Sequence, residues 1–264
     1  MSSAAVSRTR SRIGRLVSDS LALTGRSLRH MVRQVDALLL SVILPVLLLL
    51  LFVYVFGGAM AIGTRYLDYV IPGIVVLTAG YGASQAAIAV GTDLASGSVD
   101  RFRSLPLAPA SLLAGHVLAS LLRNLLSTAI VVAVAVALGF RPAAGAREWL
   151  GVLAVVGLYV LALTWVSVLV GVLASSVDAA GGFSFLVLFL PYVSSAFVPP
   201  ETLPAVLRPV AQHQPVTPVI ETMRGLLLGT PVGASGWLAL AWCAAILALA
   251  VPAAAWAFQR RTGR

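Results

Sequence analysis

Long apolar runs separated by short polar interludes dominate this sequence. The runs cover residues 37–56, 69–90, 110–138, 149–174, 182–198 and 237–257. About 20 apolar residues in a helix are enough to cross the hydrocarbon core of a bilayer, whereas transmembrane barrels show short alternating segments. The pattern therefore predicts an all-α, polytopic membrane protein with six transmembrane helices, folded as a single transmembrane domain over residues 16–264.

The residues before the first run show a different pattern. Residues 1–15 are polar and rich in arginine, which predicts a disordered cytoplasmic tail. Over residues 16–36 a helical period places apolar residues on one face and Arg26, Arg29 and Arg33 on the other. This regularity predicts an interfacial amphipathic helix anchored by its arginines near anionic headgroups, in preference to a simple extension of the first span.

A second departure from a plain bundle lies between the fifth and sixth runs. Residues 199–236 alternate prolines with apolar pieces. Thr217 is expected to cap a helix that has Pro218 in its first turn and ends at Gly229. Because this helix is too short to cross a bilayer and too apolar to be free, the segment is predicted to form an outer re-entrant or interfacial hairpin.

Composition excludes a water-soluble globule. Hydrophobic residues make up 59% of the chain, charged residues 10%, and the mean hydropathy is +0.99. The net charge of +9 comes from 18 arginines and nine acids, with no lysine. The arginines flank apolar runs, which favours contact with membrane lipids over nucleic acid. Without lysine the chain can form neither a Walker A loop nor a Schiff base, and the lone Cys243 allows no internal disulfide.

The distribution of arginine predicts the topology. With six spans, twelve arginines fall on the side of the two termini and of the loop at 93–106, and five fall on the opposite side. The protein is expected in the plasma membrane. The positive-inside rule places both termini and this loop in the cytoplasm. The third span is expected to start near Pro109 as one long helix, with His116 and Arg123 toward its cytoplasmic end and able to snorkel.

Small polar residues form stripes on two of the predicted spans. They could line a substrate path between protomers, or they could hydrogen-bond one helix to another, as such residues commonly do in membranes. Ser120 and Arg123 belong to the second stripe. The candidate path residues are Thr78, Tyr81, Ser84, Gln85, Asn124, Ser127 and Thr128.

Aromatic residues and a histidine near the ends of the spans have simpler interpretations. Tyr66, Trp149 and Trp237 are interpreted as interfacial belt aromatics. His213, alone among prolines, is expected to be packed or hydrogen-bonded, and no metal site is predicted.

The polar interlude at 93–106 carries the sequence D-L-x-x-G-x-x-D-R-F-R-S-L-P. On spacing alone it could be an ordinary loop whose charges only set topology. The sequence resembles the cytoplasmic loop of the daunorubicin-resistance permeases, within the type-2 ATP-binding-cassette (ABC-2) exporters. Residues 197–229, with their HQPVTPVIE and MRGLLLG pieces, and the opening ALLLSVILPVLLLLLFVYVFGG resemble the same family. The resemblance covers most of the chain from about residue 16 onward.

The resemblance implies a permease that works as a dimer, with itself or with a sister permease, bound to a separate ABC ATPase subunit. ATP and Mg would then be held by that partner, and this chain would carry no cofactor and no catalytic residues. The loop would form a coupling helix that docks on the ATPase. The residues assigned to this contact are Asp93, Gly97, Asp100, Arg101, Phe102, Arg103, Ser104, Leu105 and Pro106.

These observations predict an ATP-driven exporter of a lipophilic or amphiphilic small molecule, such as a drug, an antibiotic or a lipid. Two alternatives stay open. A secondary transporter or channel would need ionisable residues deep in the spans, and all nine acids lie outside the apolar runs or at their edges. A lipid-modifying membrane enzyme would need acids, histidines or serines clustered at one depth.

Overall fold

The computed structural model describes residues 35–59, 65–96 and 109–262. In the first range side chains are described from residue 42 onward, and in the third from residue 113 onward. The predicted tail, the interfacial anchors Arg26, Arg29 and Arg33, and the loop residues from Gly97 to Pro106 lie outside the described residues.

The described ranges are helical and contain no strand. Helix α2 (Val35–Leu50) continues into the π-helical turn η1 (Leu51–Phe56). The helices α3 (Tyr66–Ala95), α5 (Pro109–Ala137), α6 (Ala146–Leu173) and α10 (Ser235–Thr262) are longer. Helix α7 (Val177–Phe189) passes into the 3-10 turn η2 (Leu190–Val193). The segment between η2 and α10 holds η3 (Pro200–Thr202), α8 (Arg208–His213) and α9 (Val216–Leu228).

Four of these helices, α3, α5, α6 and α10, are long and apolar enough to cross a membrane. Two shorter apolar helices, Val42–Phe56 and Val177–Val193, correspond to the first and fifth predicted spans. The all-helical class is confirmed, whereas the count of six spans stays a prediction.

Helix α3 occupies the centre of the bundle. It packs against α6, α5, α7 and α2, and most of its residues are buried. Close approach to α6 depends on Gly171, because a Cβ there would lie 2.5 Å from the carbonyl oxygen of Ala87. Close approach to α5 depends on Gly82, where a Cβ would lie 1.9 Å from Oδ1 of Asn124. Small residues at these crossings thus let α5 and α6 pack closely against α3, as is common between membrane helices.

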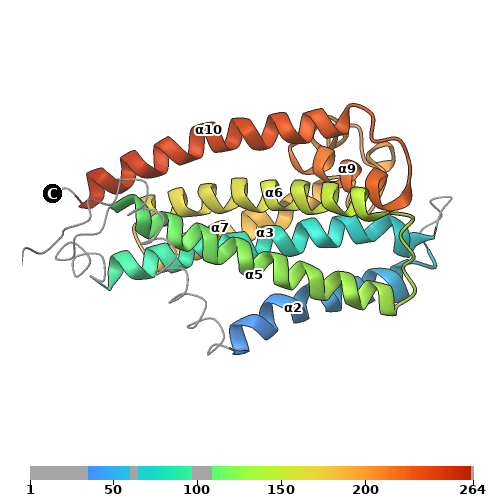
Figure 1. The fold of residues 1–264 in the computed structure, drawn as a ribbon, viewed down its shortest axis with the longest axis horizontal. Helices are drawn as coiled ribbons and strands as arrows, with labels where there is room; N and C mark the ends of the chain where they lie inside the picture. The colour runs from blue at the N-terminus through green and yellow to red at the C-terminus, as the bar shows by residue number, and fades with distance from the viewer. Residues whose placement is uncertain (1–34, 60–64, 97–108, 263–264) are drawn as a thin grey trace, which may run out of the picture.

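The two ends of the bundle differ in what they hold (Figure 1). At one end lie the C-terminus, the last turns of α3 and α6 and the first turns of α5. At the other end lie α9, the turn between α5 and α6 and the beginning of α10. We call these the C-terminal end and the α9 end.

The fifth apolar run is wrongly bounded by sequence reasoning. Its helix starts at Val177, where the Ser176 side chain accepts a hydrogen bond from the Ala179 N–H (3.1 Å), and it ends at Val193 and not at 198. The chain turns there because Ser194 Oγ donates to the Pro191 carbonyl (2.5 Å) and accepts from the Ala196 N–H (3.1 Å).

Helix α9 ends as predicted at Gly229, which adopts φ +71° in the left-handed region that favours glycine. The predicted cap is wrong. Thr217 lies inside the helix, where its hydroxyl donates to the Ala211 carbonyl (2.5 Å) and accepts from the Ser195 N–H (3.3 Å). The helix is buried against α6, α10 and α3, and a re-entrant position in the bilayer stays a prediction.

Two further expectations need correction. Helix α5 begins at Pro109 as predicted, but Arg123 lies at its middle and donates to the Gly82 carbonyl of α3 (3.3 Å), so it does not lie toward the end of the helix. Tyr66 is 6% exposed and donates to the Phe197 carbonyl (3.1 Å), which makes it a core residue and not a belt aromatic. Trp237, in contrast, is 78% exposed at the start of α10.

Candidate functional site

A polar contact joins α3 to α5 at the base of the loop that connects them. Asp93 lies in the last turn of α3 and His116 lies two turns into α5. Their Oδ2 and Nε2 atoms are 3.0 Å apart, with both side chains partly buried. Of the nine residues predicted for the coupling contact, Asp93 is the one within the described range. Its contact joins the last turn of α3 to α5 two turns beyond the start of that helix.

The helices behind this contact are also held together. An apolar cluster at the C-terminal end joins Val90 of α3, Leu113 and Val117 of α5, Val168 of α6 and Phe258 of α10. The guanidinium of Arg261 in α10 donates to the carbonyls of Val172 and, at 2.8 Å, of Ala174, where α6 ends. The base of the loop is therefore packed together with α6 and α10 as well as α3 and α5.

A hydrogen-bonded polar layer crosses the middle of the bundle. Ser120 Oγ lies 3.3 Å from Thr164 Oγ1 of α6. The amide of Asn124 donates to the Ser120 carbonyl (3.0 Å) and hydroxyl (3.3 Å). With the contact from Arg123 to Gly82, α5 is tied to both α6 and α3.

The structure brings the two predicted stripes together at the crossing of Gly82 and Asn124. Tyr81 and Gln85 are half-buried. Thr78 and Ser84 are buried and donate to carbonyls of their own helix, those of Ile74 and Tyr81 (2.7 Å each). The remaining candidates are also buried within this chain: Asn124, Ser127 and Thr128. Thr78, Ser84 and Asn124 therefore bond within their own helices, whereas the bonds between helices come from Ser120 and Arg123. Both interpretations of the stripes stay predictions.

An apolar cavity of about 200 Å³ lies beside this layer, toward the α9 end. Helices α5 and α6 supply most of its lining, with further side chains from α3 and α9. The buried hydroxyl of Thr128 lines it and has no hydrogen-bond partner among the described residues. Aromatic and sulfur-bearing side chains complete the wall: Phe140, Trp149 and Met223. Sequence reasoning singled out Thr128 but had no signal for the cavity, because its lining is assembled from four helices.

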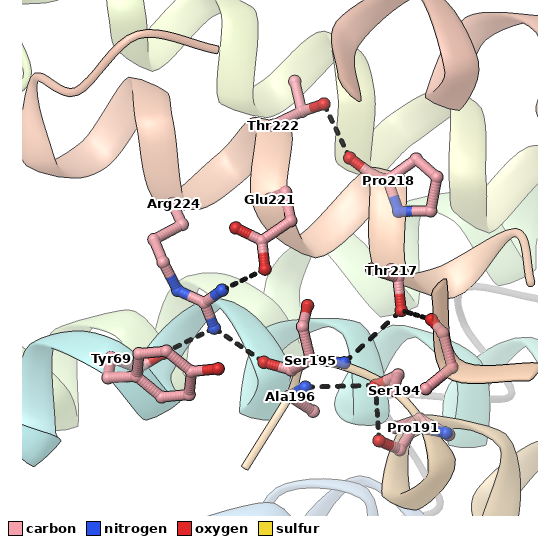
Figure 2. A network of polar contacts seen from close by, with 11 residues as sticks. Tyr69, Pro191, Ser194, Ser195, Ala196, Thr217, Pro218, Glu221, Thr222 and Arg224 are labelled. Carbon is pink, nitrogen blue, oxygen red and sulfur yellow. Dashed lines mark hydrogen bonds and ion pairs between the residues drawn. The ribbon is translucent and has the colours of Figure 1, made fainter. Parts of the chain in front are cut away.

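A second polar network lies at the α9 end and centres on Arg224 (Figure 2). This guanidinium is paired with Glu221 (2.5 Å) and donates to the carbonyls of Tyr69 (3.1 Å) and Ser195 (2.8 Å). It also lies 3.8 Å from the centre of the Tyr69 ring, a cation–π contact. Sequence reasoning missed this residue, although an arginine in an otherwise apolar helix, three residues after a glutamate, was a readable signal.

Gln214 closes the same end of the bundle. Its side-chain amide donates to the carbonyl of Leu190 (3.2 Å), where η2 begins, and to the carbonyl of Val193, where η2 ends. Together with Arg224, it ties the outer segment to α3 and to the end of α7. The network can act as a latch that holds three elements in one position.

His213 is hydrogen-bonded as expected, with its Nδ1 donating to the Pro209 carbonyl (2.8 Å). No group of three metal-ligating side chains comes together in the described part of the chain.

Comparison with known proteins places this arrangement in a family. The model of the family described as ABC-2 type transporter matches residues 19–228. A daunorubicin resistance ABC transporter permease protein, DrrB1 of Streptomyces coeruleorubidus, is 33% identical over 191 residues, which are 72% of this chain and 68% of the relative. The probable doxorubicin resistance ABC transporter permease protein DrrC of Mycobacterium tuberculosis is 28% identical over 244 residues, 90% of this chain and 87% of the relative.

The matched range includes the contact between Asp93 and His116, the polar layer and the Arg224 network. With this match and its apolar helices, the chain is a multi-pass membrane protein. The protein belongs to the ABC-2 type transporter family.

Proposed function

We propose that this protein is the membrane permease subunit of an ATP-driven ABC exporter that moves a lipophilic or amphiphilic small molecule out of the cell. The family match and the resistance named for the relatives support this class of function. The observation that carries the mechanism is the contact between Asp93 and His116. It joins two long helices at the base of the one loop that resembles the family's coupling element.

In this proposal the ATPase is a separate subunit that binds ATP and Mg and docks on the loop at 93–106. The absence of lysine from the chain supports this division, because a P-loop needs its lysine. Two permease chains, identical or sisters, would bring two loops onto two ATPase copies. When the ATPase pair closes, the loops move, and α3 and α5 move with them because Asp93 and His116 hold their ends together.

The C-terminal end of the bundle is the cytoplasmic end in this proposal, and the α9 end faces outward. The latch around Arg224 then lies where cargo leaves. The carbonyls that Arg224 binds belong to α3 and to the turn after α7, so a movement of α3 relative to that turn would disturb these contacts. The latch would keep the exit shut until ATP binds.

The lining of the 200 Å³ cavity supports a lipophilic cargo. Thr128 is the one lining residue that offers a hydroxyl, and the rest of the wall is apolar or aromatic apart from the indole N–H of Trp149. Molecules of this kind dissolve in the bilayer and can enter sideways between helices, so the permease needs no water-filled entrance.

The loop provides the direct test. Replacing Asp100, Arg101 and Phe102 together by alanine should abolish ATP-dependent export and reduce co-purification of the ATPase, while the amount of protein inserted in the membrane is unchanged. The matched control is Arg147→Ala, an exposed arginine at the opposite end of the bundle, which should leave both measurements as in the wild type. Normal ATPase association and normal export in the triple variant would overturn the assignment of the loop.

A second arm tests the class of transporter. Export that continues after the P-loop lysine of the ATPase subunit is replaced would mean that this protein works as a secondary transporter or channel.

A further inference from the structure

Arg123 is a charged residue in the middle of a membrane-spanning helix. It is flanked by about 14 residues of α5 on each side, a distance of about 21 Å at the rise of an α-helix. Its described contact is the hydrogen bond to the Gly82 carbonyl, at a long 3.3 Å. It takes part in none of the ion pairs that the described side chains form, which involve Asp68, Asp93 and Glu221.

None of the described acids lies in the middle of a helix that is long enough to cross a membrane. They lie at helix ends or in the segment before α10: Asp68, Asp93, Glu148, Asp178, Glu201 and Glu221. A guanidinium cannot lose its proton in a protein and carries five donors, of which one is used here. An ionised group at this depth is costly, and such residues commonly mark a ligand or an ion pathway. The partner that Arg123 lacks is therefore an anion.

The surroundings of Arg123 are neutral and partly open. Arg123 contacts the carbonyl of Gly82, which lies between Tyr81 and Gln85 in sequence. The side chains of Tyr81 and Gln85 are half-buried, whereas every residue of α3 from Ile71 to Gly80 is buried. On α5, the neighbouring Leu122 and Leu126 are exposed at 41% and 47%. An amphiphile lying here would place its apolar body against leucines and its polar group against a guanidinium, an amide and a phenol.

We propose that Arg123 recognises the anionic group, a carboxylate or a phosphate, of an amphiphilic cargo. The planar guanidinium binds either group through two parallel hydrogen bonds. A cationic amphiphile would instead meet an unpaired like charge at the same depth. This inference rests on the proposed function and narrows it: among lipophilic molecules, the permease selects acids over amines.

The test compares two fluorescent amphiphiles that share one apolar body, one ending in a carboxylate and the other in an amine. Inverted membrane vesicles that hold the permease together with its ATPase subunit are given ATP, and uptake of each probe is measured. The wild type should favour the carboxylate by about tenfold or more, the factor expected of one charge-assisted hydrogen-bond pair. Arg123→Gln should remove this preference, and Arg123→Lys should keep part of it. The control Arg147→Gln removes the same charge outside the membrane and should change nothing.

Several outcomes would overturn the proposal. One is equal uptake of both probes by the wild type, or an unchanged preference in Arg123→Gln. In another outcome, an anionic phospholipid co-purifies with the wild-type complex but not with Arg123→Gln, and the probe preference is unchanged. The anion bound by Arg123 would then be a resident lipid. A third is weaker cross-linking between permease chains, again with the preference unchanged, which would assign Arg123 to a contact between protomers.

The failure of the inference can be told apart from that of the proposed function. Uptake of the amine with ATP, but not of the carboxylate, would leave the exporter standing and remove only the role of Arg123. No ATP-dependent uptake of any lipophilic probe would reject the exporter itself. If Arg123→Gln does not insert, Arg123→Lys still decides, because it keeps the charge and loses the two parallel bonds.

Discussion

At the scale of single residues, two arginines in this bundle show opposite states. Arg224 has an acid, two carbonyls and an aromatic ring around it, and its terminal nitrogens make three hydrogen bonds, whereas its Nε has no hydrogen-bond partner among the described residues. Arg123 has one long hydrogen bond. The first is what a structural arginine looks like, because a buried charge is tolerated when it is paired and hydrogen-bonded. Arg224 therefore has a structural role, whereas the donors of Arg123 that have no partner in the described part of the chain are available to a ligand.

Removing Arg224 should destabilise the protein. Arg224→Ala leaves the carbonyls of Tyr69 and Ser195 and the Glu221 carboxylate without their donor; because the Glu221 side chain is partly exposed, the main cost is that of the unpaired carbonyls, about 1–3 kcal/mol of unfolding free energy. The loss should appear as a lower thermal midpoint in detergent. The control is Arg208→Ala, because Arg208 is exposed although it too binds two carbonyls, those of Glu201 and Leu203. Equal losses in both variants would contradict a structural role specific to Arg224.

The contact between Asp93 and His116 should be visible as coupling between two mutations. Asp93→Ala and His116→Ala should each slow ATP-dependent export, and His116→Ala should do so without reducing co-purification of the ATPase, because His116 lies outside the loop at 93–106. In a double-mutant cycle on unfolding free energy, the interaction should be about 1 kcal/mol, the net value typical of one hydrogen bond. Strictly additive effects of the two substitutions would show that the two side chains do not act together.

At the scale of elements, sequence reasoning succeeded where hydrophobic length decides and failed where a specific contact decides. The start of α5 at Pro109 and the end of α9 at Gly229 follow from local backbone rules. The early end of α7 was missed although the Ser194 hydrogen bonds that turn the chain there are local; Gln214, some 20 residues away in sequence, adds a contact that only the fold provides. The position of Thr217 inside α9 depends likewise on the Ser195 N–H.

The candidate site follows the same division. The polar stripes were readable from helical spacing, whereas the pairing of Asp93 with His116 was not. These residues are 23 positions apart, and only the antiparallel packing of α3 on α5 brings them together. The cavity is a stronger case, because it needs the correct crossing of α3, α5, α6 and α9 before any of its lining residues can be named.

The packing of α6 on α3 should respond to a single methyl group. Gly171→Ala would place a Cβ 2.5 Å from a backbone oxygen of α3, and a backbone cannot rotate away as a side chain can. Overpacking of this kind costs about 1–3 kcal/mol. Gly157→Ala is the matched control in the same helix, since nothing lies within 4 Å of a Cβ there. It should be neutral, or stabilising by up to about 1 kcal/mol, because alanine favours helix. A thermal midpoint lowered equally by both changes would argue against close contact between α6 and α3.

At the scale of the whole molecule, the outside of the bundle is apolar along its length. Large side chains are exposed on α2, α6 and α10, among them Leu47 (57%), Leu153 (54%) and Leu249 (74%). A monomeric soluble protein rarely shows apolar surface on this scale, so lipid or a second permease chain must cover it. Helix α3, with 30 residues, is about 45 Å long, enough to cross the hydrocarbon core and reach both headgroup layers.

The orientation of this bundle is a prediction from the distribution of arginine, and the proposed roles of the loop at 93–106 and of the Arg224 network both depend on it. If the C-terminal end is cytoplasmic, a cysteine at Gln259 in the last turns of α10 should react with a membrane-impermeant maleimide only after cells are opened. A cysteine at Glu201 in η3 should react on intact cells. Both positions are exposed, and both variants should be made in a Cys243→Ala background, although the native thiol is buried at 2% exposure. The reverse labelling pattern would put the loop at 93–106 outside the cell, beyond the reach of ATP. The coupling role, the outer latch and the direction of transport would then all be wrong together, because each depends on which end of α3 faces the cytoplasm.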